Sequence, residues 1–258
     1  MGNLIRVNGT ELGTGKPKIC VPLVAKTLQE LQAEAKSAAR LGAQLAEWRV
    51  DYYESIEPPK VQEALELLKK ELGQIPLLFT FRTLKEGGER SIEADQYKEL
   101  AAFALKSGLA DLVDVEFSAG EKAVQKLAEL AHKEQRAIVV SAHNFKHTLP
   151  ADEILKLLLE MHAAGADVVK VAVMPQSSAD VLELLQGTES FHRLYPDVPL
   201  ITMSMGALGA ISRLAGEFFG SCVSFASLNK ASAPGQLAIQ DLQNILDVLH
   251  AGFEKENS

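Results

Sequence analysis

A lysine within a run of valines is the most informative feature of this chain. Lys170 lies in the segment Val168–Val173, in which every other residue is apolar. Lysine side chains are rarely buried without a partner, because an ammonium group loses free energy when it leaves water. The lysine therefore either ends a strand and reaches water, or is an amine nucleophile that forms a Schiff base with a ketone or aldehyde. Since only a neutral amine attacks a carbonyl, the second interpretation predicts apolar neighbours or a nearby cation.

A histidine ends the apolar run that precedes this lysine along the chain. The run Ala137–His143 reads as a strand, and the next strand carries Lys170. Neighbouring strands lie about 4.8 Å apart, so the imidazole and the amine could serve one substrate, and histidine transfers protons near neutral pH. A metal site through His143 and His147 is not favoured, because Pro150 argues against a helix that presents both and no third ligand is placed.

Polar side chains also stand at or just after the ends of other apolar runs. Each alone could be a solvated charge at the rim, and the two on the fourth strand could form a structural ion-pair network. When several such side chains gather at one end of a barrel, they predict a functional site instead. They are Glu47, Arg49, Arg82, Glu86, Asp114, Glu116, Ser204 and Arg213, with Ser232 and Gln236 in a small-residue loop at 227–236 that we expect to move as a lid.

An alternation of short and long apolar segments must position these residues. Eight strand–helix units in this length predict a (β/α)8 barrel, an α/β fold whose catalytic residues lie at the carboxyl ends of the strands. The expected strands are 18–23, 43–50, 76–82, 111–117, 137–143, 167–173, 199–204 and 221–225. Helical spacing is clearest at 28–41, 61–72, 94–105, 123–131, 154–161, 179–191 and 237–249, whereas the glycines of 206–209 delay the seventh helix.

The segment before the first strand predicts a β-hairpin. Asn8-Gly9 separates two short runs, Leu4–Val7 and Glu11–Thr14, and Asn-Gly is a strong hairpin signal. We expect residues 1–16 to cap the N-terminal mouth of a single barrel domain that spans residues 1–258. A doubly wound open sheet is the main alternative fold, but the chain carries no complete glycine-rich nucleotide loop.

Composition excludes several classes of partner. The 258 residues contain 26 basic and 34 acidic side chains, for a formal charge of −8. An acidic chain repels phosphate groups, so we expect neither nucleic acid nor an anionic membrane as a partner. The uncharged stretch 198–212 is too short to span a bilayer, and the N-terminus lacks a secretion signal pattern. We therefore expect a cytoplasmic protein. Its two cysteines, Cys20 and Cys222, fit a reducing compartment, and alternation places both toward the helices.

Six segments together resemble the type I 3-dehydroquinate dehydratases, the Schiff-base dehydroquinases of the shikimate pathway. They follow one another in the family's order, from the second strand to the eighth helix, so the resemblance covers nearly the whole chain. The segments are Glu47–Asp51, Phe79–Thr83 followed by Glu86-Gly87-Gly88, Ser141–Phe145, Lys170–Ala172, Ser204–Gly206 through Ser212-Arg213, and Ala233–Gln236.

The resemblance implies a catalytic role for three residues. Lys170 would attack the C3 ketone of 3-dehydroquinate and form an imine, which acidifies the hydrogen on C2. His143 would remove that hydrogen and then donate a proton to the departing C1 hydroxyl. Glu86 would orient His143. The overall reaction would be a syn elimination of water that produces 3-dehydroshikimate, on the route to chorismate and the aromatic amino acids.

The resemblance also implies how substrate is held. Arg213 would grip the substrate carboxylate, Ser232 and Gln236 would close from the lid, and Met203, Met205, Phe145 and Phe225 would form apolar walls. No metal or organic cofactor is implied, because the lysine itself supplies the electron sink, and the family commonly forms homodimers. Glu47, Arg49 and Arg82 would bind ring hydroxyls or stabilise neighbouring charges.

Two alternatives stay open on the residues alone. Another Schiff-base barrel, such as a class I aldolase, would use the same lysine, although the loops after strands seven and eight lack a glycine-rich phosphate cradle. A non-catalytic metabolite-binding barrel would keep the pocket and the arginines but would have no use for a buried nucleophile.

Overall fold

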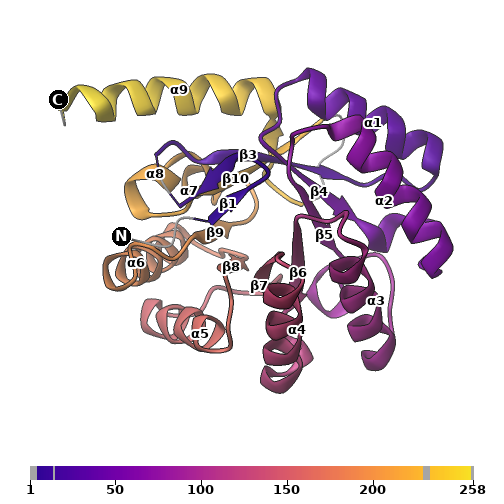
Figure 1. Cartoon of the computed structure of the whole chain (residues 1–258). Coiled ribbons are helices and arrows are strands. Elements are labelled where there is room, and N and C mark those ends of the chain that lie inside the picture. The colour runs from indigo at the N-terminus through magenta and orange to yellow at the C-terminus, as the bar shows by residue number, and fades with distance from the viewer. Residues whose placement is uncertain (1–4, 14, 229–232, 257–258) are drawn as a thin grey trace.

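The fold is a (β/α)8 barrel preceded by a hairpin (Figure 1). The computed structural model describes residues 5–13, 15–228 and 233–256. Parallel strands run side by side in the chain order expected of a barrel, and helices cover their outer face. The barrel strands are β3 (Lys18–Leu23), β4 (Leu45–Arg49), β5 (Leu77–Thr80), β6 (Leu112–Glu116), β7 (Ala137–Asn144), β8 (Val168–Val173), β9 (Leu200–Ser204) and β10 (Val223–Ser227). Every strand lies within two residues of its predicted bounds.

The helices follow their strands as the spacing predicts. The large ones are α1 (Leu28–Arg40), α2 (Pro58–Leu72), α3 (Ala94–Ser107), α4 (Glu121–Lys133), α5 (Ala151–Ala163), α6 (Ser178–Leu194) and α9 (Ile239–Glu256). Helix α2 begins three residues before the expected Val61, because proline is well suited to the first turn of a helix. The weak seventh unit forms two short helices, α7 (Ala210–Leu214) and α8 (Gly216–Phe219).

Side chains alternate between two apolar layers along each strand. In β8, Val169 and Val171 pack toward the helices, whereas Val168 and Ala172 belong to the cluster inside the barrel. This alternation places Lys170, which is 3% exposed, on the inner face. The orientation expected for the lysine is therefore confirmed, and it follows from the two-residue period of a strand.

The barrel closes between its seventh and eighth strands through a few contacts. The backbone N–H of Cys222 donates to the carbonyl of Leu200, and the residues Leu200 and Ser221 form an isolated parallel bridge. On the other side β10 pairs with β3 in regular parallel register. A short strand, β11 (Leu237–Ala238), extends from β10 before helix α9 begins. Helix α9 crosses one side of the barrel, and its C-terminal end projects beyond the other elements (Figure 1).

The predicted hairpin is present and lies at the N-terminal end of the barrel. Strands β1 (Ile5–Val7) and β2 (Thr10–Leu12) pair antiparallel around Asn8 and Gly9, which both have positive φ, as a tight hairpin turn requires. Val7 and Leu12 pack into the same cluster as Leu45, at the start of β4. The hairpin thereby fills the mouth opposite the polar residues.

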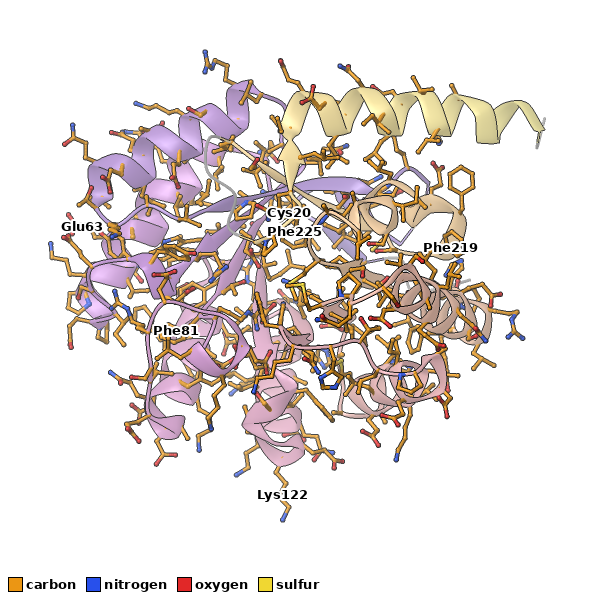
Figure 2. All side chains as sticks on the ribbon, turned by 180° about the vertical axis from the view of Figure 1, so that it is seen from behind. Cys20, Glu63, Phe81, Lys122, Phe219 and Phe225 are labelled. Carbon is orange, nitrogen blue, oxygen red and sulfur yellow. The ribbon has the colours of Figure 1, made fainter. Side chains whose placement is uncertain are left out.

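The expected orientation of the two cysteines is wrong. Both Cys20 and Cys222 belong to the cluster inside the barrel, and neither forms a disulfide. Figure 2 shows Cys20 with Phe225 at the centre of the ring of strands. Strands of a parallel barrel are apolar on both faces in their lower half, so hydrophobicity alone does not decide which face a cysteine takes.

Candidate active site

The carboxyl ends of the strands surround one cavity, and this cavity collects most of the predicted site residues. Its wall contains Glu47, Arg49, Arg82, Glu86, Gly87, His143, Phe145, Lys170, Ala172, Met203, Met205, Phe225, Ala233 and Gln236. Seven of the nine residues expected in the site therefore line it. Ser232 lies outside the described residues, and Arg213 lies behind the wall.

Lys170 is held by two carboxylates and one aromatic ring. Its Nζ lies 3.1 Å from Oε1 of Glu47 and 3.3 Å from Oδ2 of Asp114. The Phe225 ring lies beneath the ammonium, 4.7 Å from Nζ to the ring centroid. The sequence led us to expect apolar neighbours, and that expectation is wrong for the two charged contacts. Because only a neutral amine is a nucleophile, a proton must leave Lys170 before it can attack a carbonyl.

His143 and Glu86 form a tight pair beside the lysine. Nδ1 of His143 lies 3.0 Å from Oε2 of Glu86, and the backbone N–H of His143 donates to the same oxygen at 3.1 Å. In the register of β7 and β8, Ser141 lies opposite Lys170 and His143 opposite Ala172. The imidazole therefore stands one inward position beyond the amine, toward the open end of the barrel.

The two members of this pair have opposite pKa shifts. Burial, with the nearby charges of Arg82 and Lys170, holds the pKa of His143 well below its usual value. Burial and the negative charge of Glu116 raise the pKa of Glu86 to about 7, against the opposing effect of Arg82. Near neutral pH the imidazole is uncharged and the carboxyl group of Glu86 is close to its midpoint. When Nδ1–H donates a hydrogen bond to ionised Glu86, the neutral imidazole keeps Nε2 as its proton acceptor.

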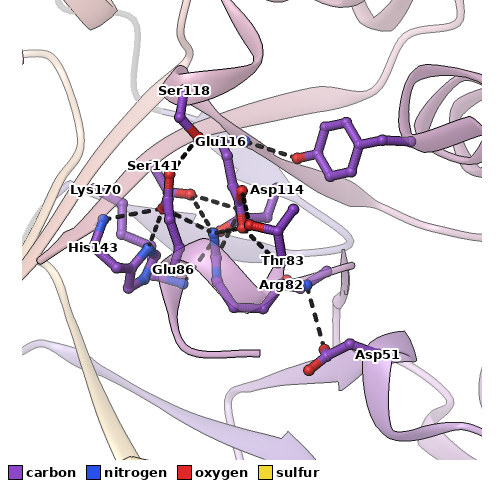
Figure 3. A network of polar contacts seen from close by, with 12 residues as sticks. Asp51, Arg82, Thr83, Glu86, Asp114, Glu116, Ser118, Ser141, His143 and Lys170 are labelled. Carbon is purple, nitrogen blue, oxygen red and sulfur yellow. Dashed lines mark hydrogen bonds and ion pairs between the residues drawn. The ribbon is translucent and has the colours of Figure 1, made fainter. Parts of the chain in front are cut away.

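Arg82 organises the carboxylates beside this pair (Figure 3). Its guanidinium lies 2.8 Å from Asp114, 3.1 Å from Glu116 and 3.6 Å from Glu86. Burial opposes the charge of this arginine, but the three carboxylates together raise its pKa above the usual range. Ser141 joins the network, since its hydroxyl donates to Asp114 at 2.7 Å and accepts from Arg82 at 3.0 Å. The cluster is buried, so each charge depends on its partners.

Arg49 lies in the cavity wall and is held there by a second ion pair. Nε and Nη2 of Arg49 donate to the two carboxylate oxygens of Asp51 at 2.8 and 2.7 Å. Asp51 also accepts from the backbone N–H groups of Arg82 and Glu89, so it joins the ends of two strands. This bidentate geometry fixes the orientation of the planar guanidinium in the cavity wall.

Arg213, predicted to grip a carboxylate, lies behind the cavity wall. Its Nη1 contacts Sδ of Met203 at 3.7 Å, and its Nη2 donates to the carbonyl of Pro234 at 3.1 Å. Among the described residues, its buried Nε has no hydrogen-bond partner. Burial lowers the pKa of Arg213 to about 10. The guanidinium is therefore one side chain away from the cavity and carries an unmatched donor.

The end of the small-residue loop packs on the loop after β9. The backbone N–H of Gly206 donates to Pro234, and a Cβ at Gly235 would lie 2.4 Å from the Gly206 carbonyl. Only glycine permits this close approach of the two backbones. Gln236 enters the cavity wall from this point.

Several contributing residues were not predicted from the sequence. Four of them hold a charged group of the site in place through a hydrogen bond: Asp51, Thr80, Ser118 and Ser141. Hydroxyl and acidic side chains also stand at the ends of strands that carry no site, so residue type alone did not mark these four. For Asp114 and Glu116 the sequence left open either a structural ion-pair network or a place in the site, and Asp114 contacts Lys170 directly. A polar inward position on a strand is the one signal that could have found Thr80 and Ser141.

The geometry provides covalent and acid–base groups rather than metal ligands. Within the described part of the chain, no cluster of three or more histidine, cysteine, aspartate or glutamate side chains could hold a metal ion. No described helix is long and apolar enough to cross a membrane. A primary amine, an imidazole poised as a base and several fixed charges meet at one cavity, which suits carbonyl chemistry on a small polar molecule.

Comparison with known proteins gives consistent matches along nearly the whole chain. The family model of type I 3-dehydroquinase matches residues 19–252. A 3-dehydroquinate dehydratase from Bacillus licheniformis is 46% identical over 251 residues, which cover 97% of this chain and 99% of the relative.

Solved structures of similar proteins share the same architecture. A type I 3-dehydroquinate dehydratase from Clostridium difficile, solved with covalent modified comenic acid, superposes with a TM-score of 0.93 at 40% identity. A 3-dehydroquinate dehydratase from Geobacillus kaustophilus also superposes with a TM-score of 0.93, at 38% identity. Each comparison covers 97% of this chain and 99% of the other. The barrel architecture is thus shared with these proteins.

Proposed function

This chain belongs to the type I 3-dehydroquinase family, and on that premise we propose that it converts 3-dehydroquinate to 3-dehydroshikimate and water through a Schiff base on Lys170. One observation carries the proposal: the Lys170 amine is buried on the inner face of the barrel and shares a cavity with the His143–Glu86 pair. The related enzyme from Clostridium difficile was solved with covalent modified comenic acid, which supports covalent chemistry here.

The first step is the formation of the imine. Glu47, whose Oε1 lies 3.1 Å from Nζ, is placed to accept a proton from Lys170. The neutral amine then attacks the C3 ketone, and His143 shuttles protons as the resulting carbinolamine loses water. The iminium formed is a stronger electron sink than the ketone, so the hydrogens on the adjacent C2 become acidic.

The second step is the elimination. Nε2 of His143 removes a C2 hydrogen while Glu86 accepts the hydrogen bond from Nδ1 and stabilises the imidazolium. The electron pair left on carbon then expels the C1 hydroxyl, which takes a proton from the same imidazolium and leaves as water. Hydrolysis of the remaining iminium releases 3-dehydroshikimate and restores Lys170. One histidine serves as base and then as acid, which is consistent with a syn elimination.

Fixed charges hold the substrate during both steps. Arg49 and Arg82 line the cavity with polar groups suited to ring hydroxyls. Arg213 supplies a planar cation behind Met203 for the substrate carboxylate, and Gln236 binds substrate from the cavity wall. A substrate-binding role for Ser232, which lies outside the described residues, is part of the same proposal. The proposal places this reaction at the third step of the shikimate pathway, in a cytoplasmic homodimer.

Reductive trapping tests the covalent step. Treatment of the protein with 3-dehydroquinate and sodium borohydride is expected to leave a mass adduct on the peptide that contains Lys170. Lys170→Ala removes the adduct, whereas Lys122→Ala, at a lysine that points outward from α4 (Figure 2), retains it. Binding of 3-dehydroquinate without any trapped adduct would favour a non-catalytic barrel, and rapid aldol cleavage of a sugar phosphate would favour an aldolase.

A further inference from the structure

The two carboxylate oxygens of Glu86 have different partners. Oε2 faces His143 and, at 3.6 Å, Nη1 of Arg82. Oε1 accepts a hydrogen bond from the hydroxyl of Ser118 at 2.6 Å. Figure 3 shows Ser118 and His143 on either side of this carboxylate. Ser118 is therefore placed to fix the rotation of the carboxylate, and with it the oxygen that His143 meets.

Most surroundings of Glu86 oppose its negative charge. The residue is 6% exposed, and the carboxylates of Glu116 and Asp114 lie close by on β6. The nearest cation, Arg82, is closer to both of those carboxylates than to Glu86. The Ser118 hydrogen bond is thus the shortest contact that favours ionised Glu86, and it lowers the pKa of this carboxyl group.

Ionisation of Glu86 decides which nitrogen of His143 carries a proton. An ionised carboxylate accepts from Nδ1–H and leaves the Nε2 lone pair toward the cavity. A protonated Glu86 instead donates to Nδ1, so that Nε2 carries the hydrogen and cannot act as a base. The charges that face this pair are Arg82, Asp114 and Glu116, with Lys170 and Arg49 acting on the imidazole.

Ser118 reaches the pair from outside the substrate cavity. It lies in the short 3-10 helix η3 (Phe117–Ala119), directly after β6, and lines a second cavity of about 340 Å³. This second cavity also touches Thr83, Ile92, Tyr97 and Glu116, and none of these five residues lines the cavity that contains Lys170. A substrate bound at Lys170 would therefore not touch Ser118.

We propose that Ser118 is a positioning residue for the dehydration, which keeps Glu86 ionised and turned so that His143 presents Nε2 to the substrate. The inference rests on the proposed function, because it assigns the base whose tautomer Ser118 controls. Ser118 acts only through Glu86 and makes no contact with the substrate. Its removal changes the pH dependence of turnover, and substrate binding is unaffected.

The test compares pH profiles of kcat and KM for matched variants. In Ser118→Ala the acidic limb of kcat is expected to move up by about one pH unit, the effect of losing one hydrogen bond to a charged group. Turnover at pH 6 then falls about tenfold, while kcat above pH 9 and KM stay near native values. Ser118→Thr keeps a hydroxyl and restores the native profile. Ser107→Ala, which removes a partly buried hydroxyl at the end of α3, leaves the profile unchanged.

A second comparison separates positioning from a general loss of structure. In a Glu86→Gln background, Ser118→Ala should add no further change in the pH profile, because its target no longer titrates. An unshifted acidic limb in Ser118→Ala, an equal loss of kcat at every pH, or a rise in KM alone would each overturn the inference. If the native protein does not dehydrate 3-dehydroquinate, the proposed function itself fails, and that result is distinct from all of these.

Discussion

Oε2 of Glu86 receives two hydrogen bonds from His143, one from ring Nδ1 at 3.0 Å and one from the backbone N–H at 3.1 Å. The backbone contact locates the carboxylate relative to strand β7, and the ring contact orients the imidazole relative to the carboxylate. Because the pair is buried beside Arg82 and Lys170, the imidazole is uncharged near neutral pH. In acid, the proton that these two residues share is therefore bound mainly to the carboxyl group of Glu86.

The pH dependence of kcat/KM is expected to follow this shared proton. Burial raises the pKa of Glu86 to about 7, so the carboxyl group is protonated below that pH and the Nε2 base is lost. We expect kcat/KM to fall about tenfold per pH unit below pH 7 and to level off above it. Glu86→Gln should lower kcat/KM and remove this acidic limb. A native profile that is flat from pH 5 to pH 8 would contradict the assignment.

Replacing the base should separate the covalent step from the elimination. In His143→Ala, kcat is expected to fall by about 10²- to 10⁴-fold, the usual contribution of general acid–base catalysis. Borohydride should still trap an adduct on Lys170, since the nucleophile is unchanged. His147→Ala, at the exposed histidine that contacts Asn144, serves as the control and should keep native turnover. Native kcat in His143→Ala would remove His143 from the mechanism.

The role of Arg213 is tested by whether its replacement changes KM or kcat. Arg213→Ala removes a cation suited to a carboxylate, and KM for 3-dehydroquinate is expected to rise about tenfold or more. Arg193→Ala, at an exposed arginine paired with Glu189, should leave KM unchanged. If KM is native in Arg213→Ala, the guanidinium only anchors the loop through its hydrogen bond to Pro234.

The buried ion pairs predict a large stability effect at Asp114. Asp114→Asn removes one negative partner from each of Arg82 and Lys170, so the free energy of unfolding is expected to fall by about 3 kcal/mol. Burial opposes the charge of Asp114, but Arg82 and Lys170 together lower its pKa, so this stabilisation is present at neutral pH and is lost in acid. Urea denaturation at pH 7 measures the change. An unaltered unfolding midpoint would show that the cluster tolerates the loss of one charge.

Two glycines with positive φ should respond differently to alanine. A Cβ at Gly73 (φ +60°) would meet open space, whereas a Cβ at Gly87 (φ +83°) would lie 2.3 Å from the Phe145 ring. In both variants the strained backbone lowers the free energy of unfolding by about 1–3 kcal/mol. Only Gly87→Ala displaces Phe145 from the cavity wall and changes KM. Equal KM values in the two variants would show that the ring moves without consequence.

Element positions and the place of Lys170 followed from the sequence. Short β-branched runs alternate with helical spacing, and each element is set by neighbours within a few residues. The two-residue period of a strand then places Lys170 with Val168 and Ala172 on the inner face. The same local reasoning failed for Cys20, because both faces of its strand are apolar and no local contrast marks the inside.

The partners of the charged groups could not be inferred in the same way. Glu47 and Asp114, which hold Lys170, lie 123 and 56 residues away from it along the chain. The contact of Ser118 with Glu86 likewise joins the ends of two different strands. Local patterns decide which residue faces inward, because secondary structure has a short period. Only closure of the barrel decides which inward groups meet, and the distances and burial created by that closure set their charges.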